Sequence, residues 1–278
     1  MENTENKNGF GISTKETASG VTISTKDAEE YRAYKRQRKI AEITSALYRS
    51  GTPIGVKEDI KKLTERAERF HQAAVKVAPT QLSAVKGYLL KSKVKLDCII
   101  GGDGETMSKV KEYEAKIARR AGAKELTLVL TPSSILLCRY GEIKKEIRRI
   151  KRAAKTAKVK VWVDKKYPFP MLARLARICS EMGVAYFCVP YFAGCERLRY
   201  DLFKACGLEV SEVETLADFK KMAGAGVERI VTPHISEIYS EWMKEAEEIP
   251  FLVEKKPVEA SNFIGEKSKT LVSDLKFV

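Results

Sequence analysis

Short apolar runs alternate with amphipathic runs along the middle of the chain, between residues 46 and 247. The apolar runs have the length and composition of strands, and the amphipathic runs repeat apolar residues at the helical period. Such alternation is typical of βα units that form a parallel sheet. Eight strands are predicted, over Ala46 to Ser50, Gln72 to Val77, Lys95 to Ile100, Glu125 to Thr131, Lys158 to Asp164, Ala185 to Pro190, Gly207 to Val210 and Glu228 to Thr232.

A glycine stands between a predicted helix and the following strand at Gly122, Gly183 and Gly226. Glycine ends helices in this way because it adopts the left-handed conformation easily. Eight repeats of one such unit predict an α/β fold, a (β/α)8 TIM barrel. A doubly wound open sheet is the alternative, but the turn over residues 101–106 lacks the full G-x-G-x-x-G spacing of that fold. We expect this turn to connect a strand to a helix near a cleft.

The two ends of the chain differ from its middle. The polar first ~25 residues have no apolar period and predict a mobile arm. A helical pattern with many basic residues follows to about Leu47, and Pro250 and Pro257 bracket the start of a polar tail. The sequence therefore predicts an N-terminal arm and basic helix over 1–45, a barrel over 46–249 and a C-terminal tail over 250–278.

Composition narrows the classes of protein. Lys and Arg number 51 against 37 Asp and Glu, which gives a net charge of +14, and 44% of the residues are hydrophobic. No apolar run approaches the ~18 residues of a membrane span, and no secretory signal begins the chain. Six scattered Cys without a C-x-x-C pair and two distant His predict free thiols, no metal and no cofactor. We expect a cytoplasmic protein that does not bind membranes.

Three segments and the spacing between them carry a resemblance to a known family. They are residues 54–63, residues 73–79, and residues 109–116 leading into 121–126. Over roughly Leu47 to Ala246 the chain resembles the deoxyribose-phosphate aldolases. The resemblance implies a barrel that acts as a carbon–carbon lyase on a small aldehyde or a phosphorylated sugar, through a Schiff base.

The resemblance also implies where the catalytic groups should lie. That family uses a lysine amine on the sixth strand, a second lysine on the seventh that lowers its pKa, and an aspartate on the fourth. In this chain Cys188 stands at the first position, residues 207–211 contain no lysine, and Thr127 replaces the aspartate. A barrel that has lost catalysis and serves as a binding or scaffold protein is therefore the alternative to a divergent lyase.

Lysines elsewhere in the predicted barrel are candidates for the missing amine. Lys160 and Asp164 match a lysine and an acid of the family on the fifth strand and share a strand face. They either serve catalysis or form an ion pair at the barrel mouth. Lys76 lies in an apolar run and is either a desolvated nucleophile or the buried partner of Asp164 or Asp97.

Two further side chains are candidates for chemistry at the same end of the barrel. Cys188 is either a nucleophile, if a lysine lowers the pKa of its thiol, or a small buried side chain. His234, after the eighth strand, is either a general acid/base or a hydrogen-bonded loop residue.

The turns that would hold a phosphate in the family are altered here. Glu212 and Glu214 after the seventh strand add charges that repel phosphate. The remaining candidates for anion binding are Gly194, Thr232 and Ser236, with Ser236 expected to cap a helix.

Residues 139–160 hold ten basic residues against two acids, a local charge of +8. An apolar stripe at Ile143, Ile147, Ile150 and Ala154 predicts a helix that docks on the sheet. The basic residues predicted on its outer face are Lys144, Arg148, Lys151, Arg152 and Lys155. This face is either solvated or binds nucleic acid through phosphates or an acidic protein. A homo-oligomer is a further possibility that the sequence leaves open.

Overall fold

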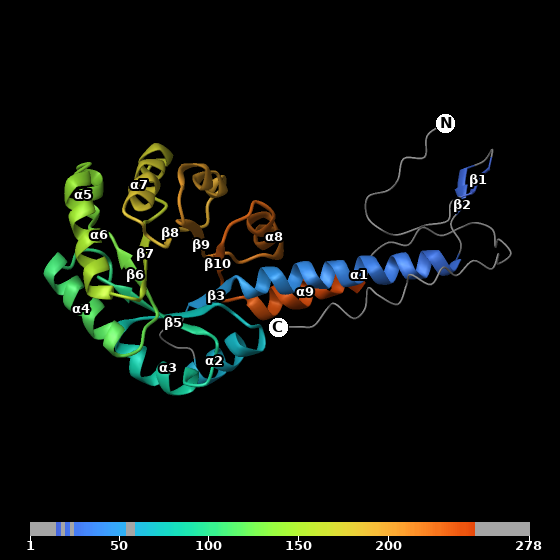
Figure 1. The fold of residues 1–278 in the computed structure, drawn as a ribbon, viewed down its shortest axis with the longest axis horizontal. Coiled ribbons are helices and arrows are strands. Elements are labelled where there is room, and N and C mark those ends of the chain that lie inside the picture. Colours follow the sequence, from blue (N-terminus) through green and yellow to red (C-terminus); the bar gives the residue numbers. More distant parts are fainter. Residues whose placement is uncertain (1–14, 18–19, 23–24, 54–58, 248–278) are drawn as a thin grey trace. The chain divides into compact units, whose positions relative to one another are not determined.

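The computed structural model describes residues 15–17, 20–22, 25–53 and 59–247 (Figure 1). The chain divides into two compact units, one of residues 1–39 and 246–278 and one of residues 40–245. In the first unit, β1 (Lys15–Thr17) pairs antiparallel with β2 (Gly20–Thr22). The helix α1 (Thr25–Tyr48) contributes to both units. Most of the predicted N-terminal arm and all of the predicted tail lie outside the described residues.

The second unit contains a closed barrel of eight parallel strands, in the order β10-β3-β4-β5-β6-β7-β8-β9 (Figure 1). Closure of the sheet confirms the predicted (β/α)8 barrel and excludes the doubly wound alternative. The strands are β3 (Ser50–Pro53), β4 (Ala74–Val77), β5 (Lys95–Ile100), β6 (Glu125–Val129), β7 (Lys158–Trp162), β8 (Tyr186–Pro190), β9 (Gly207–Ser211) and β10 (Arg229–Val231).

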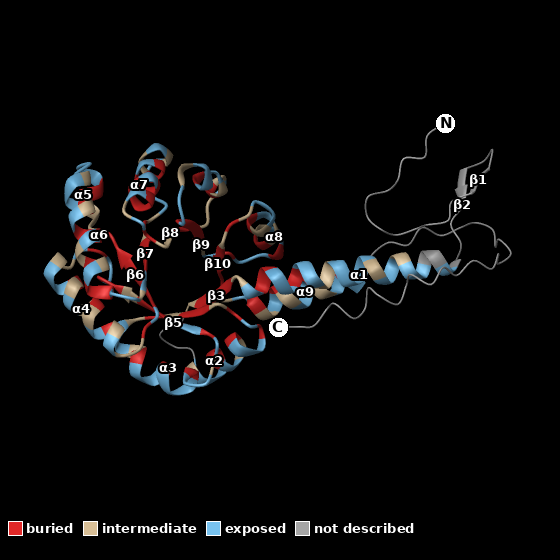
Figure 2. Ribbon diagram, viewed as in Figure 1, coloured by how far each residue is buried: buried red, intermediate tan, exposed pale blue. Residues whose placement is uncertain are grey.

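Helices surround the strands, with buried inner faces and exposed outer faces (Figure 2). The predicted apolar stripe at Ile143, Ile147, Ile150 and Ala154 is fully buried. Such packing of one helix face on the sheet is what amphipathic periodicity produces. The helices are α2 (Ile60–Arg69), α3 (Leu82–Leu89), α4 (Ser108–Arg120), α5 (Pro132–Leu136), α6 (Tyr140–Ala154), α7 (Phe169–Glu181), α8 (Leu216–Gly224) and α9 (Ile235–Glu247), with 3-10 turns η1 (Pro79–Gln81) and η2 (Cys195–Asp201).

The predicted first strand was placed too early in the chain. Residues 46–48 end α1, and the strand begins at Ser50. The reason is that Ile43, Ala46 and Leu47 are all buried at helical spacing, so they form the inward face of the helix.

A left-handed residue stands three positions before most of the barrel strands. Glycine takes this place before β6, β8 and β10, as the sequence predicts. Non-glycine residues take it before β4, β7 and β9, where φ is 48° for His71, 53° for Lys155 and 58° for Lys204. The six positions are His71, Gly122, Lys155, Gly183, Lys204 and Gly226.

Candidate active site

A cavity of about 380 Å³ opens at the carboxyl ends of the barrel strands, and we call it the mouth cavity. Barrel enzymes place their reactive groups at this end, because the loops after the strands converge there. Gly102 of the predicted strand-to-helix turn contributes to the wall. The lining residues are Pro53, Lys76, Ile99, Gly102, Thr127, Val129, Trp162, Ser211, Glu212, Glu214, Val231 and Pro233.

Lys76 contributes the only amine among the described residues that line the mouth cavity. Its side chain is 11% exposed, and its Nζ donates to Oε1 of Glu209 at 2.6 Å. The sequence left its partner open between Asp164 and Asp97. Both suggestions are wrong, because β9 places the Glu209 carboxylate against the amine.

Below Lys76, the Lys160 side chain is enclosed in the barrel interior with 1% exposure. Its Nζ lies 2.6 Å from Oδ2 of Asp97, 2.6 Å from Oε2 of Glu209 and 3.4 Å from Oε2 of Glu125. Thr127, at the position where the family has an aspartate, donates its hydroxyl to Oδ1 of Asp97 at 2.9 Å. The carboxylate beside β6, the fourth strand of the barrel, is therefore that of Asp97 on β5.

The charged interior continues toward the amino ends of the strands. Arg229 lies 3.3 Å from Oε1 of Glu125, and its guanidinium is 5.1 Å from the ring centre of Tyr186. We call the six interior groups the interior ion network. Its cations are Lys76, Lys160 and Arg229, and its anions are Asp97, Glu125 and Glu209. These six charges balance, and the partly exposed Lys95 adds a contact of 3.9 Å to Glu125 from outside the network.

The network fixes the protonation state of its central groups. Burial alone would lower the pKa of Lys160, but the carboxylates of Asp97 and Glu209 outweigh burial and raise it well above the ordinary value. Burial alone would raise the pKa of Glu209, but the ammonium groups of Lys160 and Lys76 hold it well below the usual range. The pKa of Glu125 is likewise lowered, since Lys160 and Arg229 outweigh its burial. Lys160 therefore stays charged and does not supply a free amine.

Cys188 is fully buried beside this network. Burial raises the pKa of its thiol well above the ordinary value, and the Glu209 carboxylate acts in the same direction. Lys160 and Lys76 oppose these effects without overcoming them. Because a thiolate is needed for nucleophilic attack, this environment favours the interpretation of Cys188 as a small packing residue.

Asp164 does not pair with Lys160, and this prediction is wrong. Strand β7 ends at Trp162, so the alternation that would turn Asp164 inward does not continue to it. Its carboxylate instead accepts from the backbone N–H of Lys166 at 3.0 Å and is 36% exposed.

The other predicted residues at this end are not among those that line the mouth cavity. His234 is exposed, and its backbone N–H donates to the hydroxyl of the buried Thr232 at 3.0 Å. Ser236 is the second residue of α9 and not its cap, because the helix begins at Ile235. Gly194 has a φ of 87° and precedes η2.

Sequence reasoning missed Glu125 and Glu209. Each lies in a short strand whose other residues are buried, except Ser211 at the end of β9, and each is itself 0% exposed. The signal was available, since a charged residue in an apolar strand must find a buried partner. The same argument singled out Lys76.

The predicted outer face of α6 is partly engaged by the neighbouring helix α7. Lys144 lies 2.6 Å from Glu181, and Lys151 donates to the carbonyls of Met182 and Gly183 at 2.6 and 2.7 Å. Arg148, Arg152 and Lys155 are exposed.

Fold and cavity together define the class of protein: a (β/α)8 barrel with a lysine amine held by a carboxylate at the carboxyl ends of its strands. Within the described part of the chain, no three His, Cys, Asp or Glu side chains gather where they would bind a metal. None of the described helices combines the length and apolar character that crossing a bilayer requires.

Comparison with known proteins finds similarity to deoxyribose-phosphate aldolases. No model of a protein family matches the chain. The deoxyribose-phosphate aldolase of Thermococcus gammatolerans is 36% identical over 120 residues, which cover 41% of this chain and 53% of that protein. The deoxyribose-phosphate aldolase of Clostridioides difficile is 28% identical over 192 residues, which cover 65% of this chain and 87% of that protein. The chain spans about half the length of the curated relatives that it matches at 31–36% identity.

Solved structures show the same fold. The aldolase QR15 superposes with a TM-score of 0.65 at 23% identity, over 72% of this chain and 96% of that one. The tetrameric deoxyribose phosphate aldolase of Aeropyrum pernix superposes with a TM-score of 0.61 at 19% identity, over 76% and 96% of the two chains. The chain is thus similar in sequence to deoxyribose-phosphate aldolases over part of its length, and it shares their barrel fold.

Proposed function

We propose that this protein is a divergent aldolase-type lyase that forms a Schiff base on Lys76 in the mouth cavity. The observation that carries the proposal is the position of the amine. Lys76 projects into the cavity at the reactive end of the barrel, whereas Lys160 is sealed below it. A lysine amine that reaches a cavity is the group that condenses with a carbonyl.

The interior ion network suits this chemistry because the reaction conserves its charge. The Lys76 ammonium and an aldehyde give a protonated imine and water, so one cation at Nζ replaces another. Glu209 remains a carboxylate. Burial would raise its pKa, but the neighbouring Lys160 and Lys76 outweigh burial and hold the pKa well below the usual range. It therefore stabilises the imine cation as it stabilises the ammonium, at a hydrogen-bond distance of 2.6 Å.

The next step removes a proton from the carbon beside the imine and gives a neutral enamine. The cavity wall offers two carboxylates for this proton, Glu212 and Glu214. Glu212 already binds the ammonium of Lys165 at 2.9 Å, so we assign the proton transfer to Glu214.

The charges at the mouth also indicate the substrate. Lys76 and Lys165 are each held by a carboxylate, and Glu214 adds a further negative charge. A phosphate would meet repulsion there. Of the two substrate classes that the resemblance implies, a small uncharged aldehyde suits this cavity better than a phosphorylated sugar.

Borohydride trapping tests the proposal. The protein is incubated with acetaldehyde or glycolaldehyde, reduced with sodium borohydride, digested and mapped by mass spectrometry. We expect one adduct on Lys76 that is absent from Lys76→Met. Lys165→Met, which removes the lysine paired with Glu212 of the cavity wall, should keep the adduct. An adduct spread equally over surface lysines, or none, contradicts the proposal.

The alternative is a barrel without catalytic activity that serves in binding. It is favoured by one observation: Cys188 and Thr127 stand where the resemblance implies a lysine and an aspartate, and residues 207–211 contain no lysine. A native protein that neither traps an aldehyde nor cleaves a 3-hydroxyaldehyde would support this alternative.

A further inference from the structure

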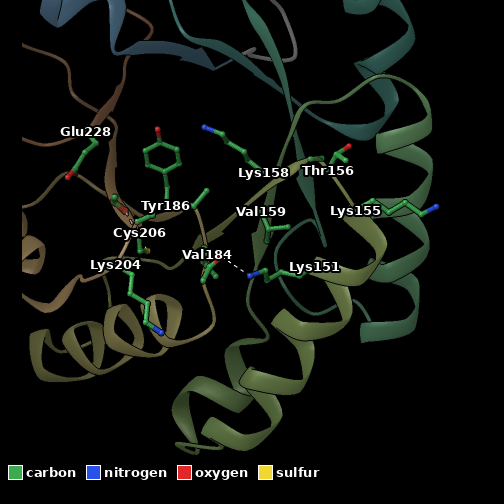
Figure 3. A pocket seen from close by; sticks show the side chains of 15 residues that line it. Lys151, Lys155, Thr156, Lys158, Val159, Val184, Tyr186, Lys204, Cys206 and Glu228 are labelled. Carbon is green, nitrogen blue, oxygen red and sulfur yellow. Dashed lines mark hydrogen bonds between the residues drawn. The ribbon is translucent and has the colours of Figure 1, made fainter.

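A second cavity, of about 600 Å³, lies at the opposite end of the barrel, and we call it the amino-end pocket (Figure 3). It is formed at the amino ends of β7, β8 and β9 and by the turns that precede them. Its polar and charged lining residues are Lys151, Lys155, Thr156, Lys158, Tyr186, Lys204 and Glu228. Loops at this end of a barrel commonly serve stability, so a role in binding needs its own evidence.

The first evidence is an excess of positive charge. Four lysines and one glutamate line the pocket. The glutamate, Glu228, is already engaged by Arg199 at 3.1 Å and by the backbone N–H of Leu208 at 2.9 Å. Lys151 is engaged by two backbone carbonyls.

The remaining three lysines have no such partner. Among the described residues, no carboxylate oxygen lies within 4.0 Å, the limit for an ion pair, of the Nζ of Lys155, Lys158 or Lys204. Three ammonium groups around one concave surface create a positive potential that a bound anion would neutralise.

The second evidence is the backbone conformation that presents two of these lysines. Lys155 and Lys204 have φ values of 53° and 58°, three residues before β7 and β9. At the matching place before β6, β8 and β10 the chain uses glycine, which adopts this conformation without strain. Three non-glycine residues take this place, and two of them, Lys155 and Lys204, line the amino-end pocket, together with Gly183 before β8. A positive φ is strained for lysine, and at both positions the strained residue brings an ammonium group to the pocket.

The third piece of evidence is the packing of Tyr186, whose ring forms the floor of the pocket. Tyr186 packs its ring against the guanidinium of Arg229 at 5.1 Å. A side chain on Gly207 would place its Cβ 3.1 Å from that ring, so glycine leaves room for it. Figure 3 shows Lys158 and Tyr186 rising from the strand starts, while Lys155 and Lys204 extend outward from opposite rims. The flexible stems of both rim lysines allow their ammonium groups to turn toward a bound anion.

We propose that the amino-end pocket binds a small ligand of the phosphate-ester or polyphosphate class with at least two negative charges. Lys155, Lys158 and Lys204 supply the charge, and the tyrosine hydroxyl and Thr156 supply hydrogen bonds. The site is independent of the Schiff-base chemistry, because it lies at the other end of the strands.

Calorimetric titration with pyrophosphate as the probe tests the site. The double variant Lys155→Gly/Lys204→Gly should lose at least tenfold in affinity, with a melting temperature equal to or higher than that of the native protein. Lys158→Gln should also weaken binding. The matched control is Arg148→Gln/Arg152→Gln, which removes two positive charges from the outer face of α6 away from the pocket, and it should bind within twofold of the native protein.

Two results would overturn the proposal. One is the absence of pyrophosphate binding by the native protein. The other is an equal loss in the pocket variant and in the α6 control, because that would show a diffuse charge effect.

Two further measurements distinguish this binding site from the lyase site and from a nucleic-acid surface. Lys76→Met should bind pyrophosphate like the native protein, which keeps the test distinct from that of the lyase. Binding of single-stranded RNA is measured with and without pyrophosphate. If pyrophosphate does not compete, and if Arg148→Gln/Arg152→Gln weakens RNA binding most, the result would indicate a nucleic-acid surface on α6 and contradict a small-ligand pocket.

Discussion

The two ends of the barrel carry opposite arrangements of charge. At the mouth cavity, Lys76 and Lys165 are each held by a carboxylate, and Glu214 is in excess. At the amino-end pocket, three lysines lack a carboxylate partner among the described residues. Phosphates in barrels of this fold usually bind at the carboxyl ends of the strands. In this protein the barrel fold determines where cavities form, whereas the side chains determine which end of the barrel attracts an anion.

The interior ion network separates the two ends. It begins at Lys76 in the wall of the mouth cavity and ends at Arg229, which packs on the floor tyrosine of the amino-end pocket. The network places matched charges where most proteins place apolar side chains. Variants that disturb it should therefore affect stability far more than variants at either end.

The largest effect is expected from Lys160→Met. The substitution leaves three buried carboxylates with two cations, and removal of one partner from a buried ion pair typically costs about 3–5 kcal/mol. We expect urea denaturation to show a loss of this size in the free energy of unfolding. The control is Lys144→Met, which breaks a partly exposed pair with Glu181 and should cost about 1 kcal/mol or less. Equal effects of the two variants would show that water reaches the network.

An intermediate effect is expected from acid. The pKa values of Glu209 and Glu125 are lowered in the folded protein, so their contribution to stability is present above the unfolded-state pKa of about 4.3 and is lost as the pH falls below it. The free energy of unfolding should drop by on the order of 2 kcal/mol between about pH 5 and pH 3. At the alkaline end, the raised pKa of Lys160 contributes stability that is lost above about pH 10.4.

The acid effect has a matched control in Lys76→Met/Glu209→Leu, which removes one charge of each sign and keeps the network neutral. Its free energy of unfolding should depend less steeply on pH below about 4.3. A slope as steep as that of the native protein would assign the acid sensitivity to other carboxylates.

The smallest effects are expected at the turns of the amino-end pocket, and they have opposite signs. Gly183→Ala places a side chain on a residue with a φ of 62°, 3.0 Å from the Lys151 ammonium, and should destabilise the protein by about 1 kcal/mol. Lys155→Gly relieves a strained backbone and should stabilise the protein by up to about 1 kcal/mol, after the greater freedom of the unfolded glycine is subtracted. Denaturant midpoints of the two variants should move in opposite directions. A loss of stability in both would mean that the Lys155 side chain holds its turn.

The architecture could be predicted from the sequence because it repeats. Seven of the eight predicted ranges cover most of an observed strand, whereas the first shares only Ser50 with β3, and the glycines at 122, 183 and 226 have the expected positive φ. The prediction of the first strand was wrong because α1 runs almost directly into β3. The buried residues Ala46 and Leu47 fit either a strand or the end of α1.

The site was harder to predict because its partners come from distant strands. Lys76 was recognisable as a charged residue in an apolar run, but its partner Glu209 lies 133 residues further along the chain. Only closure of the barrel brings β4, β5, β7 and β9 around one interior. Asp164 was expected near Lys160 because the predicted strand was two residues too long.

The neutrality of the interior ion network also restricts how the protein can change by mutation. A substitution of Glu209 by lysine would alter the local charge by two units in one step. Three lysines and an arginine would then face two carboxylates in the barrel interior. Such a change should therefore destabilise the protein unless Lys76 is lost first. The residue that is tolerated at position 209 thus depends on the residue at position 76.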